Sequence, residues 1–186
     1  MSFLKYNNYL KKRSLISKIY RNFYLYPILQ KNLKNPVLDV GCGIGDYLKF
    51  NRKSIGADIN PFIIDTLILE GHNAVLIKNE KLEFKDKSFN SVLLDNVLEH
   101  ISEPKPLLEE IKRVLCRDGI LLIGLPGLKG YNSDDDHKIN YSNDELNSLI
   151  EPLGFKLEKK IMVPLKLSFL SKVLKQFCTY TYFKKL

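Results

Sequence analysis

Residues 37–45 read Val-Leu-Asp-Val-Gly-Cys-Gly-Ile-Gly, a short apolar run that leads directly into three glycines at alternate positions. The run is typical of a buried strand, and glycines at its end allow a tight turn and leave bare backbone for a ligand. The spacing differs from the G-x-G-x-x-G dinucleotide pattern, and Asp39 lies two residues before the first glycine. A carboxylate there repels phosphate and suits a cation or an amine. We therefore expect a ligand site, the alternative being a plain strand-to-helix turn.

From Pro36 onward, short runs rich in β-branched and aliphatic residues alternate with helical patterns. The expected strands are 36–40, 54–59, 73–78, 90–95, 119–126 and 155–163. Near-continuous apolar strands separated by helices predict an α/β fold, with a doubly wound, mostly parallel sheet covered on both faces. The alternating run at 178–185 is expected to return antiparallel at the sheet edge.

Capping residues set the expected ends of the helices. Asn60 and Pro61 open a helix that stops at Gly71, and Pro104 or Pro106 opens another over Leu107–Cys116. A third helix starts at the capping box of Ser142 and Glu145 and ends at Gly154. Near the N-terminus, apolar residues follow helical spacing at positions 15, 16, 19, 20 and 23. They predict a helix that either ends at Pro27 or bends there into a second helix ending near Leu33.

Length and composition indicate one domain spanning 1–186. Its 186 residues suit a single core, and 45% hydrophobic with 27% charged residues excludes a disordered chain, a collagen-like fibre or a coiled coil. Within it we expect an N-terminal helical cap at 1–35, a ligand-binding core at 36–163, and a C-terminal helix with an edge strand at 164–186. Three scattered cysteines favour a reducing compartment, and no secretion signal or membrane-spanning run is visible, so we expect a cytoplasmic protein.

The net charge of +8 is unevenly distributed. Residues 1–35 hold eight Lys or Arg and no acid, residues 36–155 carry a net charge of −7, and residues 156–186 carry +7. Basic ends with interspersed aromatic residues are one signature of RNA binding. Solvated, lysine-rich faces are the preferred interpretation because charge runs usually serve solubility.

A second marker follows the glycine turn. The run Ser54-Ile-Gly-Ala-Asp58 is a predicted strand that ends in an acid about 13 residues after the glycines. The two oxygens of a carboxylate can accept hydrogen bonds from both hydroxyls of a ribose. The pair of signals therefore points to a nucleoside.

These motifs, taken with LEFKDKSFNSVLLDNVLEHI at 82–101 and LLEEIKRVLCRDGILLIGLPG at 107–127, resemble a class I S-adenosylmethionine-dependent methyltransferase. The likeness covers about residues 36–163 and lies nearest the ubiquinone and menaquinone methyltransferases. It implies a Rossmann-like methyltransferase sheet with N-terminal helices, and S-adenosylmethionine as cofactor with S-adenosylhomocysteine as product. By position, the resemblance implies that the methionine end is held by the glycine turn and the acid before it, namely Asp39, Gly41, Cys42, Gly43 and Gly45. It implies that Asp58 binds the ribose and that Ile59 packs on the adenine. Asp95 and Asn96 would face the methionine moiety and the substrate entrance.

One departure concerns the adenine. The family commonly places an acid and a small residue where this chain has Lys78-Asn79. Asn79 can still accept a hydrogen bond from the adenine amine through its carbonyl oxygen, whereas Lys78 cannot accept one.

Two histidines are candidates for catalysis. His137 lies in the long polar segment 127–141, where a lid over the ligand is expected, and His100 follows the fourth strand in Leu98-Glu99-His100. For His100, a structural role in which it fixes the loop is the preferred interpretation. Asp134, Asp136 and His137 suggest a metal site, but ligands within four residues need distant partners that the sequence does not supply, so no metal is expected. Cys42 has no adjacent base and is expected to pack rather than react.

The predicted function is direct, in-line methyl transfer to a small-molecule, lipid-linked or sugar-linked acceptor. The alternative is a cofactor-binding protein without catalysis, or an RNA-associated protein that uses its basic ends. Nucleic acid is the less favoured partner, and the oligomeric state is left open. Residues 164–177 place apolar side chains at helical spacing among lysines, which suits either packing on the sheet or contact with a membrane surface.

Overall fold

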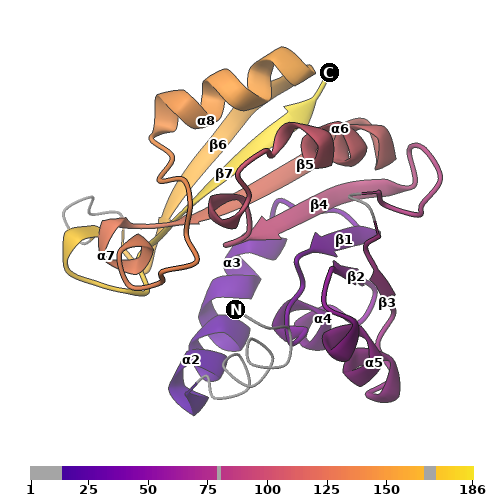
Figure 1. The fold of residues 1–186 in the computed structure, drawn as a ribbon, viewed down its shortest axis with the longest axis horizontal. Helices are drawn as coiled ribbons and strands as arrows, with labels where there is room; N and C mark the ends of the chain where they lie inside the picture. The colour runs from indigo at the N-terminus through magenta and orange to yellow at the C-terminus, as the bar shows by residue number, and fades with distance from the viewer. Residues whose placement is uncertain (1–13, 79–80, 166–170) are drawn as a thin grey trace.

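The computed structural model describes residues 14–78, 81–165 and 171–186. Within them, seven strands form one sheet in the order β3-β2-β1-β4-β5-β7-β6 (Figure 1). The strands are β1 (Val37–Val40), β2 (Ile55–Asp58), β3 (Ala74–Leu76), β4 (Phe89–Asp95), β5 (Leu115–Pro126), β6 (Phe155–Val163) and β7 (Cys178–Lys185). Strands β1 to β5 pair in parallel, which confirms the predicted doubly wound α/β sheet with its switch point between β1 and β4.

The C-terminal strand is antiparallel, as expected, but it lies between two other strands and not at the sheet edge where the sequence placed it. Strand β7 pairs antiparallel with both β5 and β6, so β6 forms the outer edge. The side chains of Tyr180, Tyr182 and Phe183 are at most 1% exposed. Strand β7 is thus an interior strand of the sheet.

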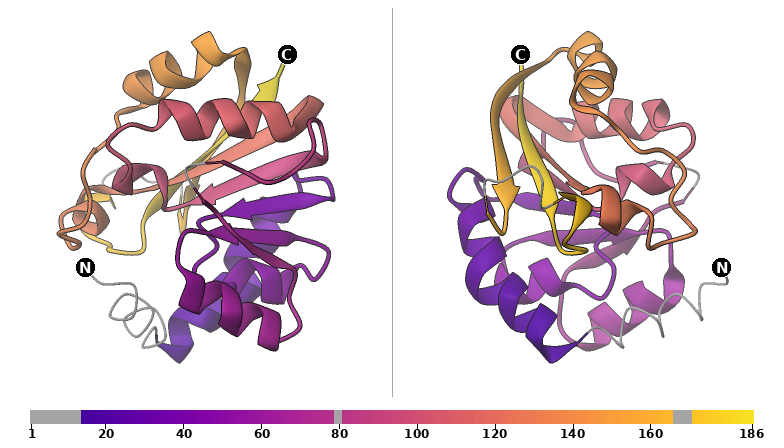
Figure 2. Two further views of the ribbon diagram at one scale, coloured as in Figure 1. Left: turned by 45° about the vertical axis from the view of Figure 1, so that its right-hand side comes forward. Right: turned by 90° about the vertical axis from the view of Figure 1, so that its left-hand side faces the viewer.

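Helices cover both faces (Figures 1 and 2). On one face, α6 (Lys105–Val114) and α8 (Asn143–Ile150) bury Leu108, Ile111 and Ile150 against the sheet. On the other, α4 (Asp46–Phe50) and the N-terminal helices pack through Tyr47 and Tyr26. Helix α5 (Pro61–Leu69) and α4 enclose a smaller core of their own. The short α7 (Leu128–Tyr131) follows β5.

The N-terminal helix bends at Pro27 rather than closing there. Helix α2 (Leu15–Tyr20) continues through a π-helical turn η1 (Arg21–Leu25) into α3 (Tyr26–Gln30), which contains Pro27. Proline has no backbone N–H to donate, and a π-helical turn before it lets the helix continue without that hydrogen bond. Apolar side chains of the first turns are exposed, namely Leu15, Ile16, Ile19 and Phe23, and the core contacts come from the later residues Leu25, Tyr26 and Leu29.

Most predicted helix ends are confirmed. The Asn60 side chain accepts from the Phe62 amide, and the capping box of Ser142 and Glu145 is formed. Helix α6 ends at Val114, two residues before the predicted Cys116, because Leu115 already pairs with Phe89 of β4. No described helix combines the length and apolar composition needed to cross a bilayer.

The predicted helix at 164–177 is wrong where it can be described. Residues 171–177 form a short 3-10 segment and turns, and residues 166–170 lie outside the described part of the chain. The segment crosses closely over the start of α7: a Cβ on Gly127 would meet Phe177 and the Ser171 backbone, and one on Gly130 would lie 2.8 Å from the Lys175 carbonyl oxygen. This close crossing leaves no room for a helix, which is about 10 Å wide.

Candidate functional site

The glycine turn lies at the carboxyl end of β1. Gly41, Gly43 and Gly45 have φ angles of 71°, 50° and 73°, a region that other residues rarely adopt. A side chain at Gly41 would collide with Val97. The Gly41 and Cys42 amides donate to the Ala57 carbonyl at 2.7 and 3.2 Å, so the turn is fixed against β2. The alternate glycines of the sequence thus form a left-handed turn in which Gly41 and Gly43 are half-buried and Gly45 is buried.

Asp58, at the end of β2, is turned toward this loop. Its Oδ2 accepts a hydrogen bond from the Gly43 amide at 3.0 Å, and its Oδ1 accepts one from the Asn60 amide at 2.9 Å. The side chain is buried, and burial raises the pKa of the carboxyl group while the amide donors oppose that rise. Ile59, beside it, is 60% exposed and so leaves an apolar side chain open to contact with a ligand. Asn79 lies outside the described residues.

A cleft of about 160 Å³, partly open to solvent, lies in front of the turn. Its wall is built by residues of the glycine turn, the end of β4, the N-terminal helix and the segment after α7: Arg21, Tyr26, Asp39, Gly41, Cys42, Gly43, Ile44, Asp46, Tyr47, Asp95, Asn96, His100, Asp134 and His137. Asp58 is not among them, although its carboxylate is bonded to the Gly43 amide of the turn. A cleft at the carboxyl ends of parallel strands, at the switch point of the sheet, is where such folds bind ligands.

Arg21 crosses the cleft and makes an ion pair with Asp95 at the end of β4. The other oxygen of Asp95 accepts from the Tyr180 hydroxyl at 2.7 Å. The Arg21 guanidinium also donates to the Tyr26 hydroxyl at 3.0 Å and lies 3.6 Å from Asp46. The residue sits in the π-helical turn of the N-terminal helix, 74 positions from its main partner. The Arg21 guanidinium thus lines the same cleft as the glycine turn.

Carboxylates outnumber cations in this cleft. Four aspartates, Asp39, Asp46, Asp95 and Asp134, line it together with the guanidinium of Arg21. Burial, and then the neighbouring Asp95 carboxylate, raise the pKa of Asp39 well above its usual range. A ligand with its own positive charge would offset this repulsion. The site therefore suits a cationic ligand that also carries one carboxylate for Arg21.

The two candidate histidines lie together. The His100 and His137 rings are 4.6 Å apart, centre to centre, and both line the cleft. Glu99, next to His100, is buried, and burial raises the pKa of its carboxyl group to about 8. Its carbonyl oxygen accepts from the Lys138 and Ile139 amides, which attaches the segment after α7 to the end of β4.

Cys42 is buried at 8% exposure, and burial raises the pKa of its thiol well above the usual range. A thiol in that state is a poor nucleophile at neutral pH, in agreement with the packing role expected from the sequence.

Sequence reasoning missed four residues at this site: Arg21, Asp46, Tyr180 and Glu99. Asp46 directly follows Gly45 and Glu99 directly precedes His100, so both could have been inferred from their neighbours in the sequence. Arg21 and Tyr180 come from the chain ends, and only the fold brings them to β4.

Comparison with known proteins agrees with this geometry. Residues 38–123 match the family model described as a methyltransferase domain. An uncharacterised protein of Methanocaldococcus jannaschii is 40% identical over 89 residues, or 47% of this chain and 43% of that protein. The human "Probable tRNA methyltransferase 9B" is 32% identical over 92 residues, or 47% of this chain and 20% of that protein. The chain thus spans less than half the length of these curated relatives.

The structure resembles solved methyltransferases along its whole length. A methyltransferase from Thermotoga maritima, described as a possible histamine N-methyltransferase, has a TM-score of 0.77 and 18% identity, with 99% of each chain covered. The fold is that of the Rossmann-like methyltransferases. Residues 38–123 match the methyltransferase domain family, and solved structures that share the fold are described as S-adenosylmethionine-dependent methyltransferases.

The cleft fits S-adenosylmethionine on charge. S-adenosylmethionine carries an ammonium and a sulfonium, which suit the cleft carboxylates, and a carboxylate, which suits Arg21.

Proposed function

We propose that this protein transfers a methyl group from S-adenosylmethionine to a small-molecule, lipid-linked or sugar-linked acceptor, by direct in-line displacement in the cleft between β1 and β4. The observation that carries the proposal is the Asp58 carboxylate, which faces the glycine turn and bonds the Gly43 amide at 3.0 Å. It supports a nucleoside bound across this edge, with its ribose hydroxyls on Asp58 and its adenine on Ile59. Asn79 would accept from the adenine amine.

In this proposal the methionine end of the cofactor lies along the cleft. The Gly41, Cys42 and Gly43 backbone and Asp39 hold the amino group, and Arg21 holds the carboxylate. Gly45 completes the turn, and Asp95 and Asn96 limit the space around the sulfonium and the acceptor entrance. Because a sulfonium is already a good leaving group, the protein mainly has to align the acceptor and exclude water.

The acceptor side lies toward the segment after α7. His137 and His100 line the cleft there, where either could contact the acceptor or take its proton. The narrower likeness to ubiquinone and menaquinone methyltransferases, and a cytoplasmic location, stay predictions.

Calorimetric titration with S-adenosylmethionine and S-adenosylhomocysteine tests the proposal. We expect micromolar binding of both, and a loss of at least tenfold in affinity for Asp58→Ala. Asp65→Ala, an exposed acid on α5, is the matched control and should bind normally. Absence of binding at millimolar cofactor would reject the enzyme.

A tRNA acceptor is the second candidate. It is favoured by the identity to tRNA methyltransferase 9B and by the net charges of +8 and +7 at the two ends of the chain. Transfer of label from methyl-labelled S-adenosylmethionine should be compared on a small-molecule extract and on bulk tRNA. Label in tRNA, with an affinity that falls steeply between 50 and 200 mM salt, would favour this candidate over the first.

A further inference from the structure

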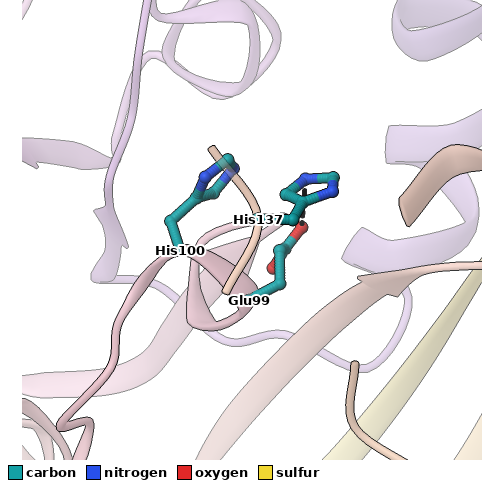
Figure 3. A group of neighbouring side chains, drawn as sticks. All are labelled: Glu99, His100 and His137. Atoms are coloured by element: carbon teal, nitrogen blue, oxygen red, sulfur yellow. Dashed lines mark ion pairs between the residues drawn. The ribbon is translucent and has the colours of Figure 1, made fainter. Parts of the chain in front are cut away.

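Glu99, His100 and His137 form a cluster at the acceptor side of the cleft. One donor atom from each of the three side chains lies within 4.8 Å of the other two. Glu99 and His100 belong to the 3-10 turn η2 (Leu98–His100) after β4, and His137 comes from the segment after α7. Figure 3 shows the Glu99 carboxylate directed at the His137 ring, with the His100 ring beside them. The sequence suggested His137 as a ligand without distant partners, and the fold supplies two of them.

Glu99 is the unexplained member. Its side chain is 1% exposed, and neither carboxylate oxygen has a hydrogen-bond partner among the described residues. Buried carboxylates are nearly always hydrogen-bonded, ion-paired or bound to a metal, since an isolated one is costly. The His137 Nε2 atom is 3.8 Å from Glu99 Oε1, too far for a hydrogen bond. A metal ion about 2.1 Å from each atom would hold them about 3 to 3.5 Å apart, so binding would draw the two side chains slightly together.

Both histidines are oriented as ligands. His137 Nδ1 lies 2.7 Å from the Tyr131 carbonyl oxygen, and His100 Nδ1 lies 3.3 Å from the Asp136 carbonyl oxygen. In each case a protonated Nδ1 donates to the carbonyl, which leaves the lone pair of Nε2 free. A backbone carbonyl on the far nitrogen is the usual support of a metal-bound imidazole.

We propose that Glu99, His100 and His137 bind a divalent first-row transition metal ion. Two imidazole nitrogens and one carboxylate favour Mn²⁺, Fe²⁺, Co²⁺ or Zn²⁺ over Mg²⁺ or Ca²⁺, and three protein ligands leave positions for other molecules. Because both histidines also line the cleft, these positions face the acceptor.

Resting on the proposed function, this site defines an acceptor class. A metal-bound hydroxyl loses its proton more readily than a free one. The acceptor hydroxyl gives its proton to water, its oxygen bonds to the methyl carbon, and the carbon–sulfur bond breaks with its electron pair left on sulfur. A histidine whose lone pair binds the metal cannot also accept a proton, so in this site His100 and His137 would act as ligands and not as general bases. The site therefore points to an oxygen acceptor.

Mn²⁺ binding, followed by the loss of the free-ion signal in electron paramagnetic resonance, tests the site without any acceptor. We expect binding in the micromolar range, weakened at least tenfold in Glu99→Gln and in His137→Gln. Glu103→Gln, an exposed carboxylate on the next loop, is the matched control and should bind like the unmodified protein.

S-adenosylhomocysteine affinity of the same variants, measured by calorimetry, separates this inference from the proposed function. It should stay within about threefold, which also shows that the variants fold. Failure of the unmodified protein to bind Mn²⁺, Co²⁺ or Zn²⁺ below millimolar concentration, or equal Mn²⁺ binding by Glu99→Gln, would overturn the metal site even where S-adenosylhomocysteine binds normally.

Discussion

Gly45 and Gly71 both have a left-handed backbone, with φ angles of 73° and 77°, but their surroundings differ. A Cβ at Gly45 would collide with Leu67 of α5, whereas one at Gly71 would meet nothing within 4 Å. The two positions therefore separate backbone strain from steric conflict at the glycine turn.

We expect Gly71→Ala to lower the free energy of unfolding by about 1 kcal/mol, from backbone strain alone. Gly45→Ala should cost about 1 kcal/mol more, because the new methyl group forces Leu67 or the turn to move. Urea denaturation at one pH measures both variants. Equal losses for the two would show that the turn is not enclosed as described.

Asp39 contributes to the site at the expense of stability. Burial and the Asp95 carboxylate raise its pKa above the unfolded value, so its ionised form is disfavoured in the folded protein. A carboxyl group with a raised folded pKa destabilises the fold above that pKa, and this cost disappears below the unfolded pKa near 4.

Asp39→Asn is therefore expected to raise the free energy of unfolding by about 1 kcal/mol or more near neutral pH. The gain should shrink as the pH falls toward about 4, where the unfolded carboxyl is itself protonated. Urea denaturation from pH 4 to pH 8 checks this, and cofactor affinity should fall in the same variant. A stability gain that is constant with pH would argue against a burial cost at Asp39.

At the level of single residues, the sequence predicted what is local. Asp58 and the glycines at 41, 43 and 45 follow directly from a strand end and a turn, and both are where they were expected. Arg21 could not be identified, because it is one of eight cations in a basic segment and its partner Asp95 is 74 positions away. Glu99 was passed over since nothing in the sequence says that its carboxylate is buried.

At the level of elements, strands and capped helices were predictable because their signals are local. Asn60, Ser142 and Glu145 form the caps that their sequence pattern predicts. The helix predicted at 164–177 failed because apolar spacing does not record the crossing over Gly127 and Gly130. The place of β7 between β5 and β6 depends on pairing across the whole chain.

The N-terminal helix carries the element-scale prediction. Its π-helical turn places Arg21 opposite Asp95, so Arg21→Met leaves a buried carboxylate without its cation. We expect the free energy of unfolding to fall by about 3 kcal/mol, and the affinity for S-adenosylhomocysteine to fall at least tenfold. Lys18→Met, an exposed change one turn earlier, is the control for both measurements. Normal affinity in folded Arg21→Met would remove Arg21 from the cofactor site.

At the scale of the whole molecule, the two ends of the chain complete a site that the central sheet begins. The N-terminal helix supplies Arg21 and Tyr26 to this site. Strand β7 supplies Tyr180, whose hydroxyl donates a hydrogen bond to Asp95. The β1 to β5 core alone would leave Asp95 without these partners. The family match at 38–123 therefore covers the glycine turn and Asp58 but neither end.

A crystal structure of the protein grown with S-adenosylhomocysteine tests the central claim most directly. Our account predicts the ribose hydroxyls within hydrogen-bond distance of Asp58, the amino-acid end on the backbone at 41–43, and its carboxylate on Arg21. Density for the nucleoside on another face of the sheet, or none at saturating ligand, would contradict it.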